Sequence, residues 1–205
     1  MSIITLVEEG EVYDIEEAVT KALKYSKPIT ILEDLIAGLR SAGDKFKTGE
    51  YFVVDMMQAA ETFKEGMKII QPKLGDAKKE YVGKIAIGTV KGDIHDIGKN
   101  LVIIMFEGAG FEVIDLGIDV DETQFIESVK KHKPDIIGLS ALLTTTMLEM
   151  ESIIQALRAN NLSKGVKIMI GGAPVSDRFA QSIGADSYAP NATEAVNRAL
   201  KLLGK

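Results

Sequence analysis

Apolar residues in the first third of the chain recur at the three- and four-residue spacing of amphipathic helices. Leu32, Leu35 and Leu39, for example, would lie on one face of a helix that begins at Pro28, a residue suited to a first turn. The helices expected from this spacing span 2–9, 13–26, 28–43 and 50–70. The pattern therefore predicts a cap domain over residues 1–78 built as a bundle of about four helices.

The pattern changes beyond residue 82, where short runs rich in Ile, Val and Leu alternate with amphipathic stretches. The expected strands are 84–89, 111–116, 135–140, 166–170 and 185–188, and the expected helices are 97–109, 121–132, 144–160, 174–183 and 191–203. Strands that are apolar almost throughout are typical of a parallel sheet covered on both faces. We therefore predict an α/β fold in which a flavodoxin-like (Rossmann-like) domain with a five-stranded parallel sheet occupies residues 82–205. The charged segment at about 74–83 is the expected boundary and a natural hinge.

Composition narrows the possible chemistry. The chain has no cysteine, which excludes disulfides, thiolate zinc sites, iron–sulfur clusters held by its own cysteines, and cysteine nucleophiles. Its two histidines cannot form a multi-histidine metal cage. A metal in this protein would therefore need a histidine, carboxylates, or a prosthetic group that brings its own ligands.

Charge and hydropathy narrow the possible partners. The net charge is −6, and the short run KKHK at 130–133 is the sole basic cluster, which argues against nucleic acid as a partner. No apolar run approaches the roughly 18–20 residues that cross a bilayer, so no membrane association is expected. The first residues turn acidic at once and lack the features of a signal peptide. We expect a cytoplasmic protein.

Three unusual loops follow the expected strands. KGDIHDIGKN occupies 91–100, SALLTTTM begins at Ser140, and GGAPV contains Gly171 and Gly172. In an open parallel sheet ordered 2-1-3-4-5, such loops meet at the edge where ligands bind. The Gly-Gly pair could be a tight turn and the Ser/Thr run a helix cap, but His95 between two aspartates is harder to explain as structure alone. We expect His95 to be functional and His132 to be a solvated surface residue.

The residues Asp93-x-His95-x-x-Gly98, then Ser140-x-Leu142 and Gly171-Gly172, resemble the cobalamin-binding signature. That signature is shared by methionine synthase, the B12-dependent mutases and the corrinoid proteins of methyltransferase systems for methylamines, methanol and methoxyarenes. The run GEYFVVDMMQAAETFKEGM also resembles the last helix of the cap that precedes the cobalamin domain in methionine synthase and in the small corrinoid carriers. One departure is that carriers often read YFLPE where this chain reads YFVVD at 51–55, which puts the start of this helix in question.

The resemblance implies a cofactor, cobalamin or a related corrinoid, with His95 as the lower axial ligand of cobalt. Asp93 would hold the other imidazole nitrogen and Ser140 would relay onward, so these three are the expected catalytic residues. The implied function is that of a methyl carrier without catalysis of its own. Cobalt(I) would accept a methyl group from a donor-specific methyltransferase, and the methylcobamide form, methyl-cobalt(III), would present it to a second methyltransferase.

The resemblance also implies the residues that surround the cofactor and its displaced nucleotide tail. The expected cofactor-binding residues are Gly92, Asp93, Ile94, His95, Asp96, Ile97, Gly98, Ser140, Leu142, Thr144, Thr145, Gly171, Gly172, Ala173, Tyr188 and Ala189. On the cap, Met56, Met57 and Phe63 are expected to shield the methyl ligand. Their alternative role is the bundle core, since apolar residues at helical spacing usually pack inward.

The implied partners are the donor-specific methyltransferase, a methylcorrinoid:tetrahydrofolate or methylcorrinoid:coenzyme M methyltransferase, and a reductive activase. Two other functions stay open. One is a B12-binding sensor or regulatory module without catalysis. The other is a metal-dependent phosphoesterase, whose sites also begin with Asp-x-His but need further histidines that this chain does not have.

Overall fold

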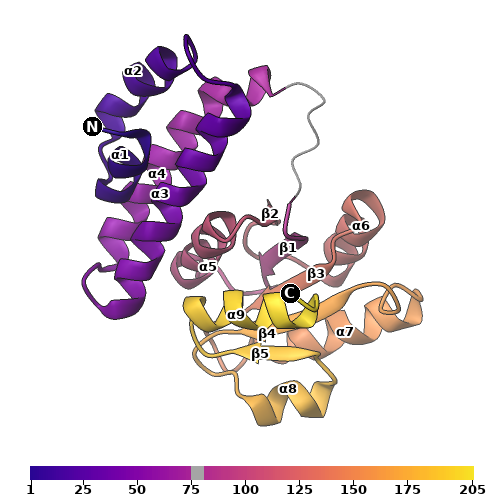
Figure 1. The fold of residues 1–205 in the computed structure, drawn as a ribbon. Coiled ribbons are helices and arrows are strands. Elements are labelled where there is room, and N and C mark those ends of the chain that lie inside the picture. Colours follow the sequence, from indigo (N-terminus) through magenta and orange to yellow (C-terminus); the bar gives the residue numbers. More distant parts are fainter. Residues whose placement is uncertain (75–80) are drawn as a thin grey trace. The chain divides into compact units, whose positions relative to one another are not determined.

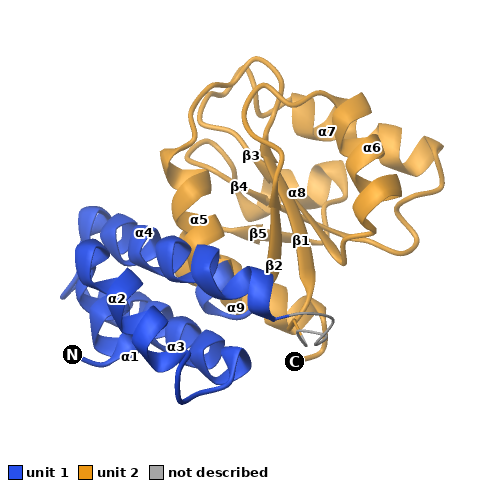
Figure 2. Cartoon of the chain, turned by 90° about the horizontal axis from the view of Figure 1, so that it is seen from above, with its two compact units in different colours: residues 1–80, 107–110 blue, residues 81–106, 111–205 orange. Residues whose placement is uncertain are grey.

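A computed structural model describes residues 1–74 and 81–205 (Figure 1). These residues form two compact units (Figure 2). The described part of the helical unit consists of residues 1–74 and Glu107–Gly110. The sheet unit contains Tyr81–Phe106 and Phe111–Lys205. Most of the linker expected at 74–83 lies outside the described residues.

The helical unit has the expected four helices. They are α1 (Ile3–Glu9), α2 (Val12–Ala22), α3 (Pro28–Thr48) and α4 (Val53–Ile70), followed by the short 3₁₀ helix η1 (Gln71–Lys73). Helix α3 continues past its expected end at Gly43 because Ala42 and Gly43 are still part of its buried face. It ends at Gly49, whose φ of 79° is the left-handed conformation that glycine adopts most readily.

Helix α4 begins at Val53 even though the proline common at residue 54 in carriers is a valine here. Asp55 lies in the first turn, and its Oδ2 accepts a hydrogen bond from the Phe52 N–H at 2.7 Å. A carboxylate in the first turn stabilises a helix start, both through this bond and through the helix dipole. Asp55 thus fixes where the helix begins.

The sheet unit contains five strands and five helices. The strands are β1 (Lys84–Thr89), β2 (Glu112–Asp115), β3 (Ile136–Ser140), β4 (Lys167–Gly171) and β5 (Ser187–Ala189), and the helices are α5 (Ile97–Gly108), α6 (Glu122–His132), α7 (Glu149–Ala159), α8 (Asp177–Ile183) and α9 (Ala192–Leu202). All strands are parallel, in the order β2-β1-β3-β4-β5. The predicted fold class is confirmed.

The register brings the predicted loops to one edge. Thr89 pairs with Ser140, Ser140 with Gly171, and Gly171 with Ala189, so the carboxyl ends of four strands lie in one row. The order of the strands reverses between β1 and β3, which is the point where ligands bind in such sheets.

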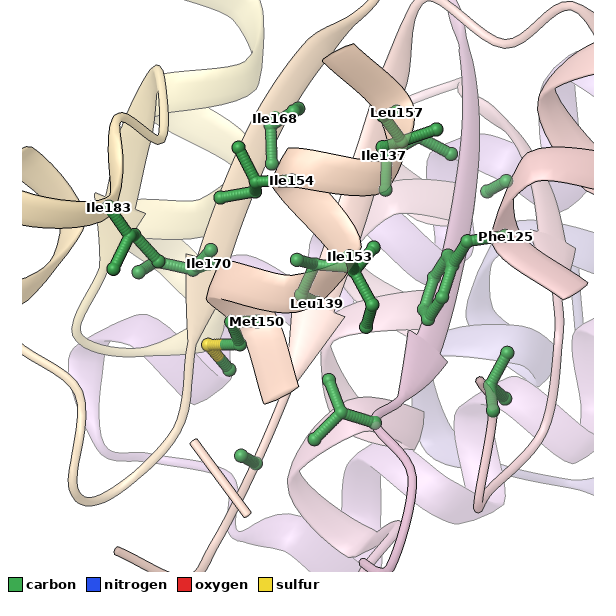
Figure 3. Packing of buried hydrophobic residues seen from close by; sticks show 14 of the residues in the cluster. Phe125, Ile137, Leu139, Met150, Ile153, Ile154, Leu157, Ile168, Ile170 and Ile183 are labelled. Atoms are coloured by element: carbon green, nitrogen blue, oxygen red, sulfur yellow. The ribbon is translucent and has the colours of Figure 1, made fainter. Parts of the chain in front are cut away.

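Helices cover both faces of the sheet. Figures 1 and 2 show α5 and α9 on one face and α6, α7 and α8 on the other. In the core under α7, four residues of this helix meet alternate residues of β3 and β4 (Figure 3). They are Met150, Ile153, Ile154 and Leu157, against Ile137, Leu139, Ile168 and Ile170. Burying each of these side chains contributes about 1.5–3 kcal/mol, so this core makes the sheet a rigid base for its loops.

Helix α7 begins later than predicted. The apolar spacing suggested a start at 144, but residues 142–148 form turns and the helix starts at Glu149. The turns direct polar groups of this segment at a carboxylate of the neighbouring loop, as described below. Over residues 1–74 and 81–205, no helix combines the length and the hydropathy that crossing a membrane would need.

Candidate functional site

The loop after β1 exposes the side chain of His95 to solvent, and Asp93 of the same loop binds one nitrogen of its ring. The imidazole Nδ1 lies 2.7 Å from Oδ1 of Asp93, and the same oxygen accepts the His95 backbone N–H at 3.0 Å. Asp93 is fully buried, whereas 46% of the His95 side chain is exposed. The carboxylate therefore fixes the ring from the protein side and leaves its other edge accessible.

The second oxygen of Asp93 is held by the loop after β3. Oδ2 accepts the Leu142 N–H at 2.8 Å, the Leu143 N–H at 3.4 Å and the Thr146 hydroxyl at 2.7 Å. Burial alone would raise the pKa of Asp93, but the hydrogen bonds from Thr146, Leu142 and His95 outweigh it and hold that pKa well below the ordinary range. Asp93 is a carboxylate at neutral pH.

The charge of Asp93 decides the tautomer of His95. An ionised carboxylate only accepts hydrogen bonds, so Nδ1 must be the donor. In the neutral imidazole, Nε2 then carries the free lone pair. This is the arrangement of a metal-binding histidine, whose second nitrogen is held by a carboxylate.

The hydroxyl that contacts Asp93 does not belong to Ser140, whose relay role stays a prediction. Ser140 was expected to continue the chain from Asp93, but across the described residues the hydroxyl that donates to Asp93 is that of Thr146. Ser140 instead ends β3, and its carbonyl accepts the Val90 N–H at 3.0 Å. The bond of Ser140 to Val90 joins the loops after β1 and β3, which gives Ser140 a structural place beside the site.

Exposed apolar side chains lie on the loops that meet at Asp93 and His95. Ile94 and Ile97 are 70% and 71% exposed, and Leu142 and Leu143 reach the site through their bonds to Asp93. Ile118 precedes Asp119, whose N–H donates to the Asp93 carbonyl at 3.1 Å. We call these five residues, Ile94, Ile97, Ile118, Leu142 and Leu143, the apolar rim. Exposed apolar side chains gathered around a polar group mark a binding surface.

The donor set fits a metal that arrives with its own ligands. Over the residues that the structure describes, no group of three or more His, Asp or Glu side chains could hold a metal ion. A single imidazole with a free Nε2 provides one ligand only. A corrin-bound cobalt would need only that one ligand, and the face of the macrocycle could cover the apolar rim. A dinuclear phosphoesterase site would need several more.

Comparison with known proteins agrees with this fit. Residues 83–197 match one family model described as a B12 binding domain, and residues 2–71 match a second model with the same description. The chain belongs to the B12-binding corrinoid proteins. Its cofactor is accordingly cobalamin or a related corrinoid.

Individual relatives cover most of this corrinoid protein. It is 44% identical to a corrinoid protein of Desulfitobacterium hafniense over 86% of this chain and 83% of that protein. It is also 44% identical to a dimethylamine corrinoid protein of Methanosarcina acetivorans, over 91% and 88% of the two chains. Among solved structures, the methanol:cobalamin methyltransferase complex of Methanosarcina barkeri matches with a TM-score of 0.91 and 28% identity, over 98% of this chain and 78% of that one.

The glycines of the corrinoid protein have different roles. Gly172 has a φ of 126°, and a Cβ there would lie 1.8 Å from the Ala141 carbonyl oxygen, so its role is to let two loops approach. Gly98 faces open space, because a Cβ at this position would meet no atom within 4 Å. Gly92 has a φ of 78°, which turns the chain into Asp93.

The other predicted site residues lie on the same edge of the sheet unit. Thr144, Thr145 and Ala173 are exposed in the loops after β3 and β4. Tyr188 is partly buried against the core cluster, next to the buried Ala189 in β5. Asp96 points its carboxylate at the Asn100 side chain, 3.0 Å away. Their contacts with the corrinoid stay predictions.

Two of the three expected cap residues are core residues. Met56 is fully buried and Phe63 is 5% exposed, so both belong to the interior of the helical unit. Met57 is exposed, together with two residues that sequence reasoning missed, Phe52 and Val54. Apolar spacing identified α4 but not which of its apolar residues face solvent.

Proposed function

We propose that this corrinoid protein is a methyl carrier. It would accept a methyl group from a methyltransferase for methylamines or methanol and present it to a second methyltransferase, with tetrahydrofolate or coenzyme M as acceptor. A reductive activase is the third expected partner. The observation that carries the proposal is the half-exposed His95, whose Nδ1 is held by a buried carboxylate and whose Nε2 is free.

The chain's own residues would hold the cofactor and control its lower side. When bound, the corrinoid supplies a cobalt centre that takes up and releases a methyl group. His95 would bind that metal through Nε2 while Asp93 keeps the proton on Nδ1 and the ring in one orientation. Thr146 and Leu142 would hold the Asp93 carboxylate in place, so that the proton stays on Nδ1 of His95.

Apolar surfaces would exclude water from the cofactor. The apolar rim lies around His95, where the corrin ring would cover it. In the helical unit, we propose that Phe52, Val54 and Met57 take the shielding role first expected of Met56, Met57 and Phe63. They are 72%, 64% and 57% exposed, respectively, which makes them available to a ligand or a partner.

The histidine content of the chain permits a sharp test of the axial ligand. Hydroxocobalamin is added to the apoprotein, reduced to cobalt(II), and examined by electron paramagnetic resonance. With His95 bound, the nitrogen splitting should change from a triplet to a doublet when the protein is labelled with ¹⁵N-histidine. His95→Ala should abolish this change, and His132→Ala, which alters the only other histidine, should leave it intact. A doublet in the His95→Ala protein would refute the assignment.

The carrier role is tested with partner enzymes. The corrinoid-loaded, reduced protein should show the spectrum of a methylated corrinoid only when a methylamine or methanol and the matching methyltransferase are both added. Omitting either one is the control. Methylation from the free methyl donor, without any partner, would mean that the chain is an enzyme in its own right.

A further inference from the structure

The loop that follows β2, at residues 117–120, is hydrogen-bonded to the end of β1 and to the His95 loop. It is tied to the end of β1 on both sides, because the Thr89 N–H donates to the Gly117 carbonyl at 3.0 Å and the Val120 N–H donates to the Thr89 carbonyl at 2.9 Å. Val120 itself is fully buried. Residues 117–120 are therefore fixed relative to the sheet.

Asp119 connects the loop at residues 117–120 to the backbone around Asp93. Its Oδ1 accepts the Gly92 N–H at 2.7 Å, and its own N–H donates to the Asp93 carbonyl at 3.1 Å. One residue thus holds the two residues that immediately precede Ile94 and His95. Because the Asp93 carboxylate orients the imidazole, any movement of this backbone would be passed to Nε2.

The conformation of Asp119 indicates that its carboxylate matters. Its φ is 55°, in the left-handed region where glycine meets no steric cost and most other residues do. Aspartate is tolerated there but not preferred over glycine. Glycine would suit this backbone conformation better, so we attribute the presence of aspartate to the short hydrogen bond that its side chain accepts from Gly92.

We propose that Asp119 is a positioning residue for the axial histidine. This inference rests on the proposed function, because it concerns how well His95 is placed for the metal of the corrinoid. The hydrogen bonds of Asp119 go to Gly92 and Asp93 and not to His95. It acts through Gly92 and Asp93, and its effect is on the orientation of the imidazole.

Three variants separate the hydrogen bond from the backbone conformation and from charge. Asp119→Gly removes the acceptor and keeps the left-handed conformation at no cost. Asp119→Asn keeps an acceptor oxygen and tolerates that conformation. Asp121→Ala is the matched control: it also removes one carboxylate that accepts a backbone N–H, that of Gln124 at 3.0 Å, but it caps α6 instead of touching the His95 loop.

Two readouts are measured on the full chain. The first is the dissociation constant for hydroxocobalamin together with the ¹⁵N-histidine splitting of the cobalt(II) form. We expect Asp119→Gly to weaken binding about three- to tenfold, less than loss of a direct partner of a ligating histidine would, and to lower the fraction that shows the splitting. Asp119→Asn should restore both, and Asp121→Ala should leave both unchanged.

The second readout needs no cofactor. Ring nitrogen shifts of the apoprotein report the tautomer of His95, with His132 as an internal reference, and Asp119→Gly should shift His95 from one tautomer towards a mixture. If wild-type protein shows no histidine splitting, the proposed function fails. The tautomer of His95 in the apoprotein then remains the test of whether Asp119 positions this ring. If wild type shows the splitting and Asp119→Gly matches it in affinity, splitting and tautomer, the positioning role is refuted. Failure of Asp119→Asn to recover the wild-type values refutes it too.

Discussion

Removing the hydroxyl of Thr146 measures how much its hydrogen bond to the buried Asp93 carboxylate stabilises the fold. Thr146→Val keeps the shape of the side chain and removes the hydroxyl, which lies 2.7 Å from Asp93 Oδ2 and 3.1 Å from the Leu143 carbonyl oxygen. Thr146 is buried, so water cannot readily take the place of the hydroxyl. A hydrogen bond to a charged group contributes about 1.5–3 kcal/mol, so the free energy of unfolding should fall by about 2 kcal/mol. Thermal unfolding of the apoprotein should move down by about 4–8 °C.

The loss should depend on pH in a defined direction. The folded-state pKa of Asp93 lies below its unfolded value, so ionised Asp93 stabilises the fold above about pH 4, and this contribution is lost as the pH falls. The Thr146 hydroxyl supports the ionised form. The unfolded-state pKa of Asp93 is the same in both proteins, so the difference between wild type and Thr146→Val should be constant at neutral and mildly acidic pH and should shrink only as the pH falls through the lowered folded-state pKa of Asp93 in the variant.

Two controls make the prediction specific. Thr146→Ser keeps the donor and should recover most of the lost stability. Thr62→Val makes the same substitution at a fully buried threonine whose hydroxyl donates to a neutral carbonyl, that of Gln58, and it should cost less than about 1 kcal/mol. Equal losses at Thr146 and Thr62, or a loss at Thr146 that persists at low pH, would show that the bond to Asp93 does not carry the effect.

Further predictions concern α4 and the buried lysine of α5. Phe63→Ala should lower the free energy of unfolding by about 3–5 kcal/mol, because this ring is buried. Phe52→Ala should lower it by less than about 0.5 kcal/mol, because this ring is exposed. Equal midpoints of urea unfolding for the two variants would contradict this assignment of core and surface. Lys99 is buried and donates to Asp115 at 2.6 Å and to Asn100 at 3.1 Å. Lys99→Met should cost about 1–2 kcal/mol in urea unfolding, since Asp115 is half exposed and water can solvate it; an unchanged midpoint would show that the ion pair contributes nothing.

Most of the fold could be predicted because hydrophobic periodicity reports burial directly. The strands β1, β3 and β4 are apolar almost throughout and the helices on one face, and the alternation of strands and helices in the sheet unit follows from that difference. The start of α7 could not be predicted in this way. The run Thr144–Thr145–Thr146 satisfies a helical pattern, but hydrogen bonds from Leu142 and Thr146 to Asp93 hold the segment in turns.

The site could be predicted only as far as chemistry is visible in residue type. A histidine between aspartates, bounded by glycines, is unusual enough to single out His95 and Asp93. The hydroxyl that contacts Asp93 was not visible, because Ser140 and three successive threonines are equivalent in sequence and only the distance to Asp93 selects Thr146. Asp119 was missed for a similar reason, since a left-handed aspartate leaves no pattern in the sequence.

A single carboxylate joins the two central loops of the sheet. Asp93 accepts five hydrogen bonds, two from His95 on Oδ1 and three from Leu142, Leu143 and Thr146 on Oδ2. An asparagine cannot take this place, because its amide group would point two hydrogens at donors on one side or the other. The same anion that sets the tautomer of His95 therefore also fixes the turns that precede α7. The tautomer of His95 and the turns before α7 thus depend on one charge, which lies between the loops that follow the paired strands β1 and β3.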